Sequence, residues 1–148
     1  MQLLEFLVPL DFLDAVEPYI THIILALVLA NMATRFLAHN RHVSQAEQTD
    51  DDGDISQYTP HVASTLLLVL TSFLYMIIHP HGGMVMSALV VGVFLTDFFE
   101  FEARKVEVRN DLSLERPKSA VVASLLLLLY AAFQSLFFLV KPYWQMVI

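Results

Sequence analysis

The stretch AVVASLLLLLYAAFQSLFFLV, residues 120–140, contains 21 residues and no charged side chain. As an α-helix it would be about 31 Å long, close to the hydrocarbon thickness of a bilayer. It follows a basic segment, residues 104–119, which carries five of the eight Lys and Arg residues of the chain. A basic cluster beside a membrane span is typical of the cytoplasmic side. The stretch therefore predicts both a transmembrane helix and its direction in the membrane.

Three further apolar segments predict transmembrane helices, at about residues 18–38, 61–79 and 84–99. Before the second of these, Thr59 and Pro60 are suited to the N-cap and to the first helical position. The 148 residues should therefore form a single integral-membrane domain with four spans.

The segments between and after the spans predict how the helices are joined. Residues 39–60 and 100–119 are polar and should form cytoplasmic loops, whereas Pro80-His-Gly-Gly83 has the composition of a tight turn. The start of the second loop alternates apolar and polar residues as a small β-hairpin does, but its composition fits an extension of the third helix equally well. We expect a helical extension followed by a loop. Lys141-Pro142 should end the fourth helix.

Residues 1–17 are apolar but are interrupted by Pro9 and by four carboxylates, so they are too charged to span a membrane. A short amphipathic helix at the membrane interface fits this pattern. Because its polar face lacks Lys and Arg, packing against the protein's own spans is an equal expectation.

The composition excludes several classes of protein. With 57% hydrophobic and 16% charged residues, the chain is more apolar than an ordinary globular domain, and the absence of cysteine excludes disulfides and thiolate chemistry. The net charge of −7 and acidic clusters such as Asp50-Asp51-Asp52-Gly53-Asp54 argue against nucleic-acid binding. Acidic loops around Leu- and Val-rich spans resemble the small, uncharacterised integral-membrane proteins of haloarchaea. This resemblance implies an archaeal, halophilic membrane protein and no particular activity.

The basic residues also predict the orientation of all four spans. The two polar loops lie on one side of the membrane and hold seven of the eight cations, namely Arg35, Arg41, Arg104, Lys105, Arg109, Arg116 and Lys118. The opposite side holds Lys141 alone. Because Lys and Arg concentrate on the cytoplasmic side, both termini should face outward.

Polar side chains inside the spans are the candidates for function, because they are costly in lipid and usually face protein or water. One face of the second span carries Ser64, Thr71, Ser72, Tyr75 and His79. The other candidates are Asn31, Asp97, Tyr130 and Gln134, of which the last two lie four apart and predict an interhelical hydrogen-bonding pair. We favour helix packing for this polar face over a polar pathway through the bundle.

Small or polar residues also recur every four positions in two spans, at His22, Ala26, Ala30 and Thr34 and at Ala88, Gly92 and Thr96. Small residues at this spacing let helices approach closely. These faces therefore predict contacts with another helix.

Two groups of histidines follow from the topology. His22, His79 and His81 should lie near the outer surface, and His39, His42 and His61 near the inner one. Imidazole is a common ligand of zinc, copper and iron, so the outer group is a candidate ligand set. A metal site needs ligands that converge on one point, and nothing in the spacing requires this. We therefore predict no metal and no cofactor.

Asp97 lies near the inner end of the third span, where an unpaired carboxylate would be costly. The favoured expectation is that Asp97 reaches the membrane interface or forms an ion pair with Arg35 or Arg104. A proton relay is the alternative, and it would need a partner at depth such as Asn31 or Tyr130.

Together these patterns predict an all-α fold, a bundle of four transmembrane helices with a short N-terminal interfacial helix. No catalytic motif is present, so we expect a non-enzymatic structural or accessory subunit that packs in the bilayer against its own copies or a larger membrane protein. One alternative is a small oligomeric transporter or channel using the polar face. Another is a redox subunit that binds metal or haem through the outer histidines.

Overall fold

The computed structural model describes residues 10–48, 57–110, 112 and 118–147. Within these ranges the chain is helical and contains no strand. The helices are α2 (Leu10–Val16), α3 (Ile20–Gln48), α4 (Thr59–Ile78), α5 (Pro80–Arg109) and α6 (Lys118–Val147). The predicted all-α fold is confirmed. Helix α2 lies in the segment predicted to be interfacial, of which residues 1–9 are outside the described ranges.

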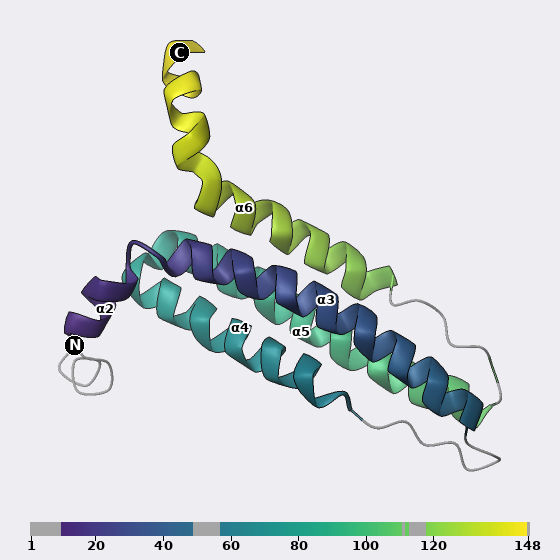
Figure 1. Cartoon of the computed structure of the whole chain (residues 1–148). Coiled ribbons are helices and arrows are strands. Elements are labelled where there is room, and N and C mark those ends of the chain that lie inside the picture. The colour runs from purple at the N-terminus through teal and green to yellow at the C-terminus, as the bar shows by residue number, and fades with distance from the viewer. Residues whose placement is uncertain (1–9, 49–56, 111, 113–117, 148) are drawn as a thin grey trace.

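The four long helices form a bundle in which each helix packs most extensively against two others (Figure 1). Helix α3 packs against α4 and α6, and α5 packs against the same two helices. Each of the four is long and apolar enough to cross a membrane, by length and composition. The bundle has a hairpin end, where α4 is joined to α5, and a basic end, where α3 finishes and α4 begins.

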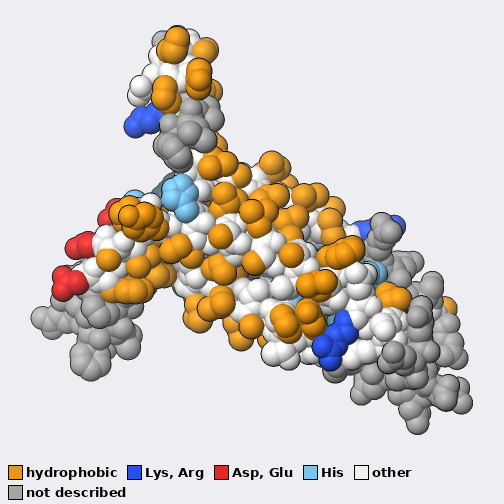
Figure 2. Space-filling model, in the orientation of Figure 1, with side chains coloured by type: hydrophobic (Ala, Val, Ile, Leu, Met, Phe, Trp, Pro, Cys, Tyr) orange, Lys and Arg blue, Asp and Glu red, His pale blue; other side chains and the backbone are white. Residues whose placement is uncertain are grey.

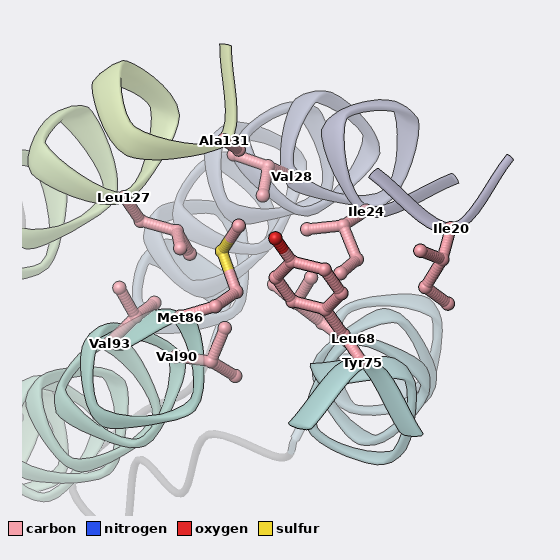
Figure 3. Close-up of a cluster of buried hydrophobic side chains, with 10 residues drawn as sticks. All are labelled: Ile20, Ile24, Val28, Leu68, Tyr75, Met86, Val90, Val93, Leu127 and Ala131. Atoms are coloured by element: carbon pink, nitrogen blue, oxygen red, sulfur yellow. The ribbon is translucent and has the colours of Figure 1, made fainter. Parts of the chain in front are cut away.

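The centre of the bundle is an apolar core built from all four long helices (Figure 3). It consists of Ile20, Ile24, Val28, Leu68, Tyr75, Met86, Val90, Val93, Leu127 and Ala131. Most of the apolar surface lies outside the core, because only 28% of the residues in the apolar part of each span are buried inside the bundle. Hydrophobic side chains cover the visible sides of the molecule along its length (Figure 2). Such an exposed belt is stable when it faces lipid or another protein.

The predicted turn at Pro80–Gly83 is wrong, because α5 already begins at Pro80 and His79 alone separates the two helices. Proline suits the start of a helix, where its missing N–H would have no helical partner. Gly83 serves packing instead of a turn. A Cβ built on it would lie 2.1 Å from Cα of Met76, so the backbones of α4 and α5 meet there.

Other helix ends also differ from the prediction. Residues 39–48, expected in a loop, continue α3, while the expected helical extension of α5 is confirmed as far as Arg109. The N-cap of α4 is Tyr58, so Thr59 is the first helical residue. Pro142 lies inside α6 and does not end it. A proline within a helix removes one hydrogen bond and favours a bend, and the C-terminal part of α6 turns away from the bundle in Figure 1.

Candidate functional site

A bidentate ion pair joins α3 to α5 in the half of the bundle nearer the basic end. Arg35 donates from Nε to Oδ1 of Asp97 over 2.8 Å and from Nη2 to Oδ2 over 2.7 Å. The Arg35 residue is only 3% exposed. Two parallel bonds fix both side chains, because the planar guanidinium fork matches the carboxylate. Two ion-pair partners were predicted for Asp97, Arg35 and Arg104, and Arg35 is the one that forms the pair.

Asn31 extends this pair to α4. Its Oδ1 accepts a 2.7 Å hydrogen bond from Nη2 of Arg35, and its Nδ2 donates to Oγ of Ser64 and Oγ1 of Thr65, both over 2.9 Å. Because arginine can only donate, the contact with Arg35 fixes which end of the Asn31 amide is the oxygen. The fully buried amide thus uses its oxygen and its nitrogen to connect α3 with α4 and the ion pair.

His61 closes the network from the α4 side. Its Nε2 lies 3.1 Å from Oδ2 of Asp97, and its Nδ1 lies 2.9 Å from Oγ1 of Thr34, which is 3.0 Å from Oγ of Ser64. We call Asn31, Thr34, Arg35, His61, Ser64, Thr65 and Asp97 the Arg35–Asp97 network.

Thr34 connects His61 with α3 inside the network. An ionised carboxylate only accepts, so Nε2 of His61 donates to Asp97. The Thr34 hydroxyl has three polar atoms within reach, namely Nδ1 of His61, Oγ of Ser64 and the carbonyl oxygen of Asn31, which is 2.9 Å away. This one hydroxyl of α3 therefore contacts two polar side chains of α4.

A second buried arginine lies further toward the basic end. Nη1 of Arg104 is 2.9 Å from Nδ1 of His42, and Arg104 is 5% exposed. Because arginine donates, Nδ1 of His42 accepts, which makes the ring neutral with its proton on Nε2. The His42 ring also packs against Phe101. This contact attaches the end of α3 to α5.

The two arginines and their partners line one cavity of about 180 Å³ between α3, α4 and α5. Its polar lining includes Arg35, His42, His61, Asp97 and Arg104. The apolar lining includes Leu66, Phe94 and Phe98, which are between 42% and 54% exposed on the outer surface of the bundle.

A separate polar cluster, the Tyr75 cluster, lies at the hairpin end. Tyr75 donates to Oε1 of Gln134 over 3.3 Å, Nε2 of Gln134 donates to the Tyr130 hydroxyl over 3.0 Å, and Tyr130 donates to the carbonyl of Gly82 over 3.3 Å. The predicted Tyr130–Gln134 contact exists within α6. The interhelical bonds are made by Tyr75 of α4 and by Gly82 of α5.

The predicted polar face of α4 does not act as a unit. Ser64 belongs to the Arg35–Asp97 network, and Tyr75 to its own cluster. Ser72 is fully buried, and its carbonyl accepts a 3.1 Å bond from Ser87 of α5. Thr71 instead donates to the carbonyl of Leu67 in its own helix. The apolar core lies between the two polar clusters.

The histidines lie at the two ends of the bundle as predicted, with His22, His79 and His81 toward the hairpin end, but neither group converges on one point. At the hairpin end, His22 contacts the Ser135 hydroxyl, while Nε2 of His79 lies 3.6 Å from Glu17. His81 and His79 line a shallow surface depression there. In the part of the chain that the structure describes, no three His, Cys, Asp or Glu side chains converge as a metal site would require.

Fold and site together define a helical protein with four candidate membrane spans and a buried ion-pair network. The chain belongs to the family of a domain of unknown function, DUF7313, whose model matches residues 2–148. No curated protein and no solved structure matches the chain.

Proposed function

We propose that this membrane protein is a non-enzymatic structural or accessory subunit that associates through the outer faces of α3 and α5. The observation that carries this proposal is the exposure of its small-residue faces. Ala26 and Ala30 of α3 and Ala88 of α5 are exposed, and a Cβ at Gly92 would meet nothing within 4 Å. Small residues left open on a membrane helix suit close packing against a second helix.

The polar interior supports a structural role over a channel or transporter. The Arg35–Asp97 network and the Tyr75 cluster are tied into interhelical hydrogen bonds, and the apolar core with Leu68 and Met86 separates them. A conducting path would need polar groups or water through that core. The redox alternative has no support from geometry, because no three His, Cys, Asp or Glu side chains of the described residues converge as metal ligands would.

The charge distribution supports an orientation with the basic end in the cytoplasm and both termini outside. Seven of the eight Lys and Arg residues belong to the segments at that end. The net charge of −7 also supports a haloarchaeal origin, because an excess of acidic residues keeps proteins soluble in high salt.

The native mass of the purified protein in mild detergent tests the proposed association. We expect the wild type to migrate as a homo-oligomer or with a stoichiometric second polypeptide. Gly92→Leu should reduce the mass to that of one chain, because the added side chain blocks close helix approach. Ala63→Leu adds similar bulk on the exposed face of α4 and should leave the assembly intact. A wild type that migrates as a single chain would contradict the proposal.

A further inference from the structure

Two buried guanidinium groups in the bundle each have one buried nitrogen atom that lacks an acceptor. Nη1 of Arg35 and Nε of Arg104 are buried and make no hydrogen bond. Buried polar groups are nearly always paired, because an unmade bond leaves the cost of removing the group from water uncompensated. Both side chains line the same cavity between α3, α4 and α5. Two arginines with unpaired nitrogen atoms beside one cavity indicate that the cavity holds a hydrogen-bond acceptor.

The partners of Arg104 suit an anionic acceptor, because none of the described carboxylates near it is bonded to it. The charge of Arg35 is balanced by Asp97, whereas Arg104 is bonded to a neutral nitrogen of His42. The carboxylates of Asp97, Glu100 and Glu107 lie near enough to act on the charge of Arg104, but no ion pair joins Arg104 to a carboxylate of the described residues. The cation of Arg104 therefore remains available to a ligand.

We propose that this cavity binds a phosphate group. Arginine suits the task, because its donors match the oxygens of phosphate in a planar arrangement. The volume of about 180 Å³ corresponds to roughly six water molecules at about 30 Å³ each, which admits one such group. A phosphate in the cavity would lie beside both guanidinium groups, whose N–H groups would donate to its oxygens, and it would bridge α3 to α5.

The group can come from free phosphate or from a phospholipid headgroup. The exposed apolar rim formed by Leu66, Phe94 and Phe98 is compatible with an acyl chain beside the cavity. Basic pockets between transmembrane helices near the cytoplasmic surface bind anionic lipid headgroups. The shared chemistry is the phosphate, and two probes separate its sources.

The test measures both sources on the wild-type protein and on two variants. Calorimetric titration with sodium phosphate, against sodium chloride of equal ionic strength, detects free phosphate. Native mass spectrometry after mixing with phosphatidylglycerol or phosphatidylcholine micelles detects a bound lipid. We expect saturable binding of at least one phosphate-bearing probe, and phosphatidylglycerol retained over phosphatidylcholine if the source is lipid. Absence of saturable binding of either probe to the wild type would overturn the proposal.

The variants assign the binding to the cavity. Arg104→Gln should weaken binding by about tenfold or more, as expected for the loss of charge-assisted hydrogen bonds. Arg109→Gln removes a cation from an exposed position on the same helix and should bind as the wild type does. Equal binding by the two variants would overturn the assignment.

A third variant covers the case in which Arg104→Gln does not fold. Arg104→Lys keeps the charge but lacks the Nε donor, so its affinity for the bound probe should still fall. Unchanged affinity in Arg104→Lys would contradict a phosphate held by the guanidinium.

Discussion

Arg35 is the side chain that most constrains the interior, because a cation buried between apolar helices is tolerated only with a partner. Every polar neighbour of its guanidinium acts as an acceptor. Asp97 supplies two oxygens, and Asn31 supplies a third. These three contacts connect α3 with α5, and the hydrogen bonds of Asn31 to Ser64 and Thr65 connect both with α4. A change at one residue should therefore affect the packing of three helices.

Replacement of Asp97 tests this dependence. In Asp97→Asn the buried Arg35 loses its counter-charge, and breaking a buried pair in this way costs about 3–5 kcal/mol of unfolding free energy. Unfolding of the purified protein in mixed micelles measures the loss. The exposed pair of Glu102 and Lys105, 3.2 Å apart, provides the control. Glu102→Gln should cost at most about 1 kcal/mol.

A double variant of the ion pair separates the effect of charge from the effect of packing. Arg35→Gln combined with Asp97→Asn removes both charges, so it should be less destabilised than the sum of the single variants. Strict additivity of the two substitutions would show that the ion pair does not stabilise the bundle.

At the scale of the elements, the close approach of α4 and α5 depends on Gly83. Gly83→Ala would put a Cβ 2.1 Å from Cα and 2.4 Å from N of Met76, so the helices must separate. Overpacking of this kind costs about 1–3 kcal/mol. Gly92→Ala is the matched control on the same helix, because nothing in the chain lies within 4 Å of its Cβ, alanine is still a small residue on the association face, and helix propensity gains up to about 1 kcal/mol.

Thermal denaturation in detergent distinguishes the two glycine variants. We expect Gly83→Ala to lower the midpoint and Gly92→Ala to leave it unchanged or raise it. Equal midpoints for the two variants would mean that the hairpin tolerates a side chain at its closest point.

The four long helices were predictable from sequence, because apolar runs of bilayer length have few other structures open to them. The residues at which these helices begin and end were not predictable, because hydropathy indicates which residues face lipid and does not show where the helical hydrogen bonding stops. Helix α3 continues past residue 38 through a polar segment to Gln48. This extension matters for the site, because it brings His42 of α3 onto Arg104 of α5.

The sequence limited the ion-pair partner of Asp97 to Arg35 or Arg104. Which of the two forms the pair depends on how far α3 is shifted along α5, and the sequence does not show this shift. The sequence did hold one signal that was missed. Asn31, Arg35, Ala38 and His42 are spaced by four, three and four residues, as are Asp97, Phe101, Arg104 and Val108. This heptad-like spacing marks one face of each helix, and both faces point into the bundle. Burial of Thr65 and its bond to Asn31 had no comparable signal.

At the scale of the whole molecule, the polar groups are divided between the two ends of an apolar bundle. Acidic side chains gather at the α2 end in Figure 2, and cations at the opposite end, with one further cation on the C-terminal part of α6. A protein of this form has only two possible orientations if its four long helices cross a membrane. Lys and Arg near span ends favour the cytoplasm, so the basic end should face inward.

Labelling of single cysteines tests this orientation, and the chain is well suited to it because it contains no cysteine of its own. Asn110→Cys lies at the end of α5 near the basic end, and Gln145→Cys lies in the C-terminal part of α6. Both positions are exposed. In intact cells, a membrane-impermeant maleimide should label Gln145→Cys and not Asn110→Cys, and detergent permeabilisation should make both reactive. The reverse pattern in intact cells would show that the charge bias does not govern insertion of this protein. Equal labelling before permeabilisation would instead mean that the two ends are not separated by a bilayer.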